Sequence, residues 1–256
     1  MKKYLVLFLL FGVWANLFSQ GRSKDTVTSR IPEKSPWSGN MSIRGFYMKG
    51  NTNKFYGMGT GELKRQDSIY TLDLNATFDY GESDKIKDEN SFFGDFSADL
   101  FHHNLLSPLV MQIGEYNFSR GIVFRSQTGG GLKLNFIRHP EHKTSISLAA
   151  IYDYTNLINI PGNEDTRKWR LSWRFKTVQI LFAKRLILSN VTFFQPSVTA
   201  LSNTIWRVET VLDAPVLSFL SLQAAYLYTR EDNVSAGRKH SDHKVTFGLS
   251  VYSNNK

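Results

Sequence analysis

The sequence predicts an all-β protein, an antiparallel up-and-down transmembrane β-barrel of about 12 strands. Three observations lead to this prediction. Residues 1–19 form an apolar leader, apolar and polar residues alternate in segment after segment behind it, and short connections alternate with longer ones. Alternation with a period of two gives each strand one apolar face and one polar face. A membrane barrel turns the apolar face to lipid and the polar face to its lumen.

The leader has the three parts of a secretory signal. Lys2 and Lys3 precede an apolar run at 4–13, and small residues at 15–19 predict cleavage near Ser19/Gln20. An anchor helix is the alternative, but the run falls short of the ~20 residues that a spanning helix needs. We therefore expect a signal peptide at 1–19, a flexible periplasmic lead-in at 20–36 and an outer-membrane barrel at 37–256.

Six strands are predicted in the first half of the barrel. The first places Met41, Ile43 and Tyr47 on one face, and the second is rich in glycine, which permits the bending that barrel closure demands. The third interleaves Leu72 and Leu74 with polar residues, and the fourth and sixth alternate in the same way. The fifth alternates poorly. Their ranges are 37–48, 54–64, 68–80, 91–102, 108–118 and 123–136.

The second half repeats the scheme. Apolar residues alternate with polar ones in all six segments, as where Trp169, Leu171 and Trp173 interleave with Arg170 and Arg174. The ranges are 144–154, 167–178, 186–194, 204–212, 220–229 and 244–252.

Connection lengths predict how the barrel sits in its membrane. Short turns are expected at 65–67, 104–107, 138–142, 182–185 and 214–217. On the other side we expect longer loops at 81–89, 155–166, 195–203 and 230–243, with short turns at 49–53 and 119–122. Short periplasmic turns, longer outer loops and an even strand count are typical of outer-membrane barrels.

Alternation alone does not say which face points outward, because a soluble ligand-binding barrel alternates as well. Twelve strands enclose more space than side chains readily fill, and tyrosines and tryptophans recur near strand ends, where membrane girdles form. We therefore expect the apolar face outside and charges of both signs inside. These charges either set permeation selectivity or pair and close the lumen. The expected lumen charges are Asp73, Asp95, Asp99, Lys133, Asp153, Arg170, Arg174, Lys176, Arg207, Glu209 and Lys244.

Composition limits the partners. The chain has no cysteine, so no disulfide, lipid-anchor or thiolate metal site is available. Its formal charge is +9, or +7 once Lys2 and Lys3 are removed with the leader. The sequence has no basic cluster with interleaved aromatics, so nucleic acid is not an expected partner. The expected partners are outer-membrane lipid, the barrel-assembly machinery and small solutes or ions. No cofactor is expected, because phosphate-binding and calcium-binding loops are missing from the sequence.

The stretch MSIRGFYMKGNTN, 41–53, resembles the opening of the YdiY-like putative salt-induced outer-membrane proteins, a domain of unknown function. Softer similarities follow at Gly129–Gly131, at Trp169 with Trp173, at 207–210 and at 244–247, so the resemblance covers about 38–252. It implies a barrel linked to salt or osmotic stress, and no functional residues follow from it.

Two other functions stay open, an outer-membrane hydrolase at the barrel rim and a soluble periplasmic ligand-binding barrel. A hydrolase needs a nucleophile beside an oriented base. His102 and His103 adjoin one predicted turn, and His240 and His243 lie in the last loop beside Asp242, where a metal site is also conceivable. Solvated loop residues explain these histidines more simply. We therefore predict a protein that is not an enzyme and has no catalytic or metal site.

Overall fold

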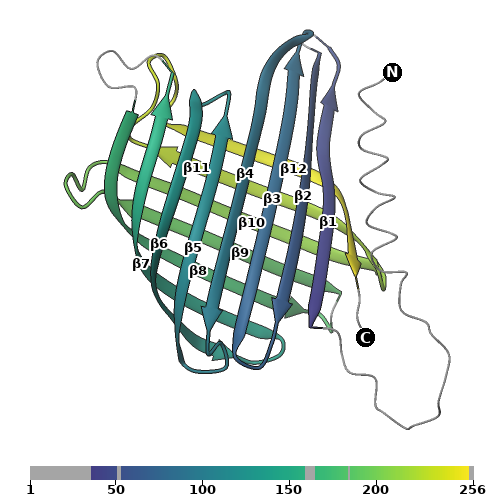
Figure 1. The fold of residues 1–256 in the computed structure, drawn as a ribbon. Helices are drawn as coiled ribbons and strands as arrows, with labels where there is room; N and C mark the ends of the chain where they lie inside the picture. The colour runs from purple at the N-terminus through teal and green to yellow at the C-terminus, as the bar shows by residue number, and fades with distance from the viewer. Residues whose placement is uncertain (1–35, 51–52, 159–164, 184, 254–256) are drawn as a thin grey trace, which may run out of the picture. The chain divides into compact units, whose positions relative to one another are not determined.

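In the computed structural model of the chain, the described residues form twelve antiparallel strands that close into one barrel (Figure 1). The structure describes residues 36–50, 53–158, 165–183 and 185–253. Each strand pairs with its neighbours in the sequence, and β1 pairs with β12 from Gly39 opposite Ser253 to Gly45 opposite Phe247. Closure leaves no free strand edge. The strands are β1 (Trp37–Met48), β2 (Lys54–Gln66), β3 (Tyr70–Ser83), β4 (Ile86–Leu100), β5 (Leu106–Asn117), β6 (Ile122–Arg138), β7 (His142–Leu157), β8 (Asp165–Leu181), β9 (Leu186–Pro196), β10 (Thr204–Leu217), β11 (Leu220–Glu231) and β12 (Ser241–Ser253).

The fold class and the strand number are therefore confirmed, and each predicted segment corresponds to one strand. The expected signal peptide at 1–19 lies outside the described residues, as does the lead-in at 20–36 except for Pro36. Among the described residues, no helix has the length and apolar character needed to cross a bilayer.

The two ends of the barrel differ in their connections. β1 begins and β12 ends at the same end, which we call the termini end. Its connections are 67–69, 101–105, 139–141, 182–185 and 218–219. The opposite end, which we call the loop end, carries 49–53, 84–85, 118–121, 158–164, 197–203 and 232–240. The predicted asymmetry is present, with the longest connections all at the loop end.

One predicted loop was wrong. The polar stretch 81–89 is not a long loop, because β3 and β4 continue through it to a turn of only Asp84 and Lys85. Their φ angles are 48° and 68°. Two successive residues in the left-handed region form the kind of tight turn that matches the twist of a hairpin. The polar residues of 81–89 therefore extend strands at the barrel rim.

The apolar faces point outward. The side chains of Leu74 and Leu171 are 49% and 41% exposed, whereas their neighbour Arg170 is 4% exposed and points into the barrel. Aromatic side chains such as Tyr47 and Trp169 are also exposed on the outer surface. This orientation matches a barrel in lipid and argues against a soluble barrel with an apolar interior.

Close approach at the β1–β12 seam requires glycine. A Cβ atom on Gly248 would lie 1.9 Å from the backbone oxygen of Ile43, a distance that no side chain can occupy. By contrast, nothing lies within 4 Å of a Cβ placed on Gly59. Gly248 therefore lets the last strand pack against the first and complete the closure.

An apolar cluster crosses the interior, which the sequence did not predict. We call it the septum; it runs from β4 to β9, five positions apart in the ring of strands. It explains why 108–118 alternates poorly, since β5 is apolar on both faces and Val110 is exposed on the outer one. The septum comprises Leu109, Met111, Ile113, Ala149, Ile151 and Phe193, with Phe93 and Val191 packed against them.

Candidate functional site

The eleven charged residues predicted to face the lumen lie on the inner face of the barrel. Six of them line one cavity, namely Asp73, Asp95, Arg174, Lys176, Arg207 and Glu209. Asp99 and Lys133 line a second cavity and pair at 2.5 Å between Nζ and Oδ2. Arg170, Asp153 and Lys244 belong to ion pairs nearer the loop end.

The two larger cavities occupy the half of the lumen toward the termini end. One has a volume of about 660 Å³ and is lined by His102 and Arg138 at that end. The other, of about 460 Å³, reaches inward to Phe93. The cavities adjoin, because Lys64 and Lys176 line both. We call the two together the vestibule.

A cation–π contact closes the inner end of the vestibule. The guanidinium of Arg207 on β10 lies 4.0 Å from the ring centre of Phe93 on β4. These strands are six positions apart in the ring of twelve, so the contact bridges opposite walls. A second cation–π contact joins neighbouring strands, with the guanidinium of Arg174 on β8 at 5.0 Å from the ring centre of Phe193 on β9. A partly buried contact of this kind contributes about 1 to 2 kcal/mol.

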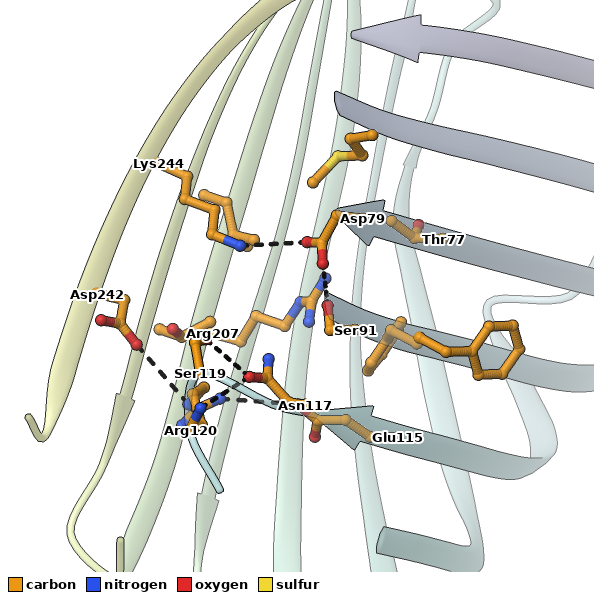
Figure 2. A pocket seen from close by; sticks show the side chains of 15 residues that line it. Thr77, Asp79, Ser91, Glu115, Asn117, Ser119, Arg120, Arg207, Asp242 and Lys244 are labelled. Carbon is orange, nitrogen blue, oxygen red and sulfur yellow. Dashed lines mark hydrogen bonds and ion pairs between the residues drawn. The ribbon is translucent and has the colours of Figure 1, made fainter. Parts of the chain in front are cut away.

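Beyond this contact the lumen is nearly filled. The cavities there measure only about 10 to 40 Å³. Figure 2 shows the cavity of about 40 Å³, where charged and polar side chains from several strands point toward one another. A volume of this size holds about one water molecule. The septum and the ionic groups beyond it therefore separate the vestibule from the loop end.

Buried ion pairs hold the loop end closed. The carboxylate of Glu231 on β11 accepts hydrogen bonds from both terminal nitrogens of Arg125 on β6, at 2.6 and 2.7 Å. It also forms an ion pair with a terminal nitrogen of Arg120 at 2.7 Å. Arg125 also contacts Glu115 at 2.8 Å. β6 and β11 are five positions apart in the ring, so these bonds cross the lumen. With the side chain of Glu231 only 3% exposed, the pairs are shielded from water and strong.

A neighbouring pair ties a loop to the same cluster. Arg170 Nε donates to Asp153 Oδ2 at 2.6 Å, and its terminal nitrogens donate to Asn203 in the connection 197–203 at 2.9 and 3.0 Å. Asp153 also lies 4.0 Å from Arg125. We call the charged residues of this cluster the closing network: Glu115, Arg120, Arg125, Asp153, Arg170 and Glu231.

A second ionic cluster closes the side nearest the seam. Lys244 Nζ on β12 lies 3.1 Å from Asp79 on β3 and 2.9 Å from Glu89 on β4. The hydroxyl of Tyr56 donates to Asp79 at 3.0 Å. Figure 2 shows the contacts of Asp79 with Lys244 and with Ser91, whose hydroxyl donates to the same carboxylate. Two carboxylates thus converge on a single lysine, and a phenol and a hydroxyl support one of them.

Sequence reasoning missed part of this arrangement. Arg120 lies in a predicted turn, Glu231 lies in a predicted loop, and Glu115 lies in the segment that alternates poorly. Lys64, Glu62 and Arg44 also face inward and occupy polar positions of well-predicted strands, so strict parity along β1 and β2 would have found them.

The histidines do not form a catalytic arrangement. His240 Nδ1 contacts the backbone oxygen of Glu231 at 2.9 Å, His243 contacts Tyr226, and His102 contacts Gln66. Within the described residues, no histidine hydrogen-bonds to a serine or a carboxylate side chain. In the same part of the chain, no group of three or more potential ligands could hold a metal ion.

Asp232 lies outside the strands, and its surroundings lower its pKa. It lies in the connection 232–240 and accepts hydrogen bonds from the hydroxyl and from the backbone N–H of Thr204, the latter at 3.0 Å. The hydroxyl hydrogen bond is the main cause that holds the pKa of Asp232 below its ordinary value. The bonds therefore favour the ionised carboxylate and fasten this connection to the start of β10.

Comparison with known proteins places the chain in a family. Residues 43–252 match the family described as "Protein of unknown function, DUF481". The chain belongs to this family. The match spans the barrel from β1 to β12, as the resemblance seen in the sequence did. The family description assigns no activity, and no curated protein matches the chain.

A solved porin structure supports the barrel fold of this DUF481 protein. The chain is similar to one titled "NanC porin structure in rhombohedral crystal form", with 10% identity, a TM-score of 0.53 and coverage of 84% of this chain and 100% of that one. A "Bacterial polysaccharide outer membrane secretin" follows with 7% identity, a TM-score of 0.42 and coverage of 88% and 100%. The "Translocator domain of autotransporter NalP from Neisseria meningitidis" has 10% identity, a TM-score of 0.39 and coverage of 98% and 97%. The likeness of fold rests on the porin, whose TM-score exceeds 0.5.

Proposed function

We propose that this DUF481 protein is a narrow outer-membrane channel for small polar solutes or ions, and not an enzyme. The observation that carries the proposal is the vestibule, a charged space of about 660 and 460 Å³ in two adjoining parts. An interior that served only to stabilise the fold would pack side chains there, as it does at the septum. The porin-like fold and the outward apolar faces support a place in the outer membrane.

In this proposal the structure corresponds to the closed state of the channel. The contact between Arg207 and Phe93 blocks the vestibule, and the closing network blocks the loop end. Opening requires that Arg207 leave the ring of Phe93 and that the connection 118–121, which carries Arg120, move away from Glu231. The pore is narrow in either state, since barrels with open aqueous channels have about 16–18 strands.

Topology and environment follow from the same proposal. The termini end faces the periplasm and the loop end faces the outside, in the usual arrangement of such barrels. The chain reaches the membrane as a secreted precursor, and the barrel-assembly machinery inserts it among outer-membrane lipids. A link to salt or osmotic stress rests on the sequence resemblance alone. It is tested by following the amount of the protein after external salt is raised.

Single-channel recording in a planar bilayer tests the channel. We expect small, infrequent conductance steps from the wild-type protein and larger, more frequent ones from Phe93→Ala, because that variant removes the ring that Arg207 covers. Phe96→Ala is the matched control, since Phe96 lies on the outer face of the same strand and is 38% exposed. Absence of conductance from both the wild-type protein and Phe93→Ala would overturn the proposal.

A further inference from the structure

Among the residues that the structure describes, two opposite walls of the inner part of the vestibule carry opposite charges that no ion pair neutralises. This part is the cavity of about 460 Å³. On β8, Arg174 and Lys176 face it, and neither makes a hydrogen bond or an ion pair within the described residues. The Nε atom of Arg174 is buried without a hydrogen-bond partner, a costly arrangement for a guanidinium.

The facing wall is acidic. Glu62 on β2 and Asp95 on β4 line the same cavity. Within the described residues neither makes an ion pair, and Asp95 accepts one hydrogen bond, from Asn75 at 3.2 Å. Glu62, Asn75 and Asp95 form one row across three strands. β2 is six positions from β8 in the ring of twelve, so Glu62 and the two cations stand on opposite walls.

The remaining charges of this cavity are already paired. Glu209 lies 3.6 Å from Arg44 and 3.7 Å from Arg207. Lys64 lies 3.9 Å from Asp73. Within the described residues, these pairs leave two cations on one wall and two carboxylates on the other without an ion pair. A single-charge solute would therefore be attracted by one wall and repelled by the other.

We propose that this cavity binds a small zwitterion, a solute that carries a carboxylate at one end and an ammonium group at the other. The carboxylate lies against Arg174 and Lys176, and the ammonium group donates to Glu62 and Asp95. The volume falls within the range of ordinary small-ligand pockets. The proposal gives the substrate class of the channel proposed above and rests on it, because such a solute is the one that would pass.

Calorimetric titration of the intact barrel in detergent tests binding independently of permeation. The probes are 4-aminobutyrate, which has both charges, and butyrate and butylammonium, which have one each. Glycine and 6-aminohexanoate serve as shorter and longer zwitterions that measure the span between the walls. We expect the best-fitting of the three zwitterions to bind at least about tenfold more tightly than butyrate or butylammonium.

Variants separate this site from general effects of charge. Lys176→Gln and Glu62→Gln should each weaken zwitterion binding about tenfold. The double variant Lys176→Glu with Glu62→Lys exchanges the two charges, so it should recover part of the binding affinity with the zwitterion bound in the opposite orientation. Lys87→Gln is the control, because Lys87 lies outside the vestibule over the ring of Phe118. Far-ultraviolet circular dichroism and heat-modifiable gel migration show which variants are folded.

Two results would overturn the proposal. Butyrate binding as tightly as the best zwitterion would indicate a plain anion site, and absence of binding by every zwitterion would show that no such site exists. Zwitterion binding without any bilayer conductance, in contrast, would uphold this inference and overturn the channel. The two failures are therefore distinguishable.

Discussion

Glu231 joins two arginines of the closing network at the loop end. Its carboxylate lies within 2.7 Å of two guanidinium groups and makes a bidentate pair with Arg125. Glu231→Gln keeps the shape of the side chain and removes the charge. Both arginines would then remain buried with fewer anionic partners, which is the costly way to break a buried ion pair.

The magnitude follows from burial. Removing one partner of a fully buried pair costs about 3 to 5 kcal/mol. A loss of about 3 kcal/mol lowers the folding equilibrium constant more than about a hundredfold. Asp67→Asn is the control, since its ion pair with Arg65 spans 3.8 Å and the side chains of Arg65 and Asp67 are 36% and 43% exposed. Such a partly solvated pair contributes less than about 1 kcal/mol.

Urea unfolding in lipid vesicles, followed by tryptophan fluorescence, measures both variants. We expect Glu231→Gln to unfold at a clearly lower urea concentration than Asp67→Asn, with an unchanged slope. In the bilayer, Glu231→Gln should also open more often than the wild-type protein. Equal unfolding midpoints for the two variants would refute the view that the closing network holds the loop end together.

Three further predictions concern the seam, the outer surface and pH. Gly248→Ala should sharply reduce the fraction of heat-modifiable, folded barrel on a gel, because its Cβ would meet a backbone oxygen. Gly59→Ala, where nothing lies near the added Cβ, should fold normally. Equal folding of the two variants would contradict the account of the seam. Leu74→Arg should lose about 2 to 4 kcal/mol of stability in vesicles, as expected for a charge in the lipid, whereas Asn75→Arg, which faces the vestibule, should lose less; the reverse order would mean that the faces are inverted. Asp232 has a lowered pKa when folded, so the stability it adds is present above about pH 4 and is lost as the pH falls through the folded pKa. The advantage of the wild-type protein over Asp232→Asn in urea unfolding should shrink accordingly as the pH is lowered below about 4, and a difference independent of pH would contradict this.

The strand pattern needed only local information. A residue's parity along an extended chain fixes the face on which its side chain lies, so Leu74 and Asp73 could be assigned to opposite faces from the sequence. The eleven predicted lumen charges face inward for the same reason. The prediction failed where apolar and polar residues do not alternate. The polar run 81–89 resembles a loop, although Asp84 and Lys85 alone make the turn.

Neighbours along the chain were enough to establish the fold class, the strand order and the face of each strand that meets lipid, because all three are local properties. Which inward charges meet one another became known only from the closed barrel. Arg125 and Glu231 lie 106 positions apart in the chain yet bond at 2.6 Å, while Arg174 and Lys176 on a neighbouring part of the wall form no ion pair within the described residues. Contacts across a lumen depend on barrel shape and side-chain length, and no periodicity in the chain records either of them.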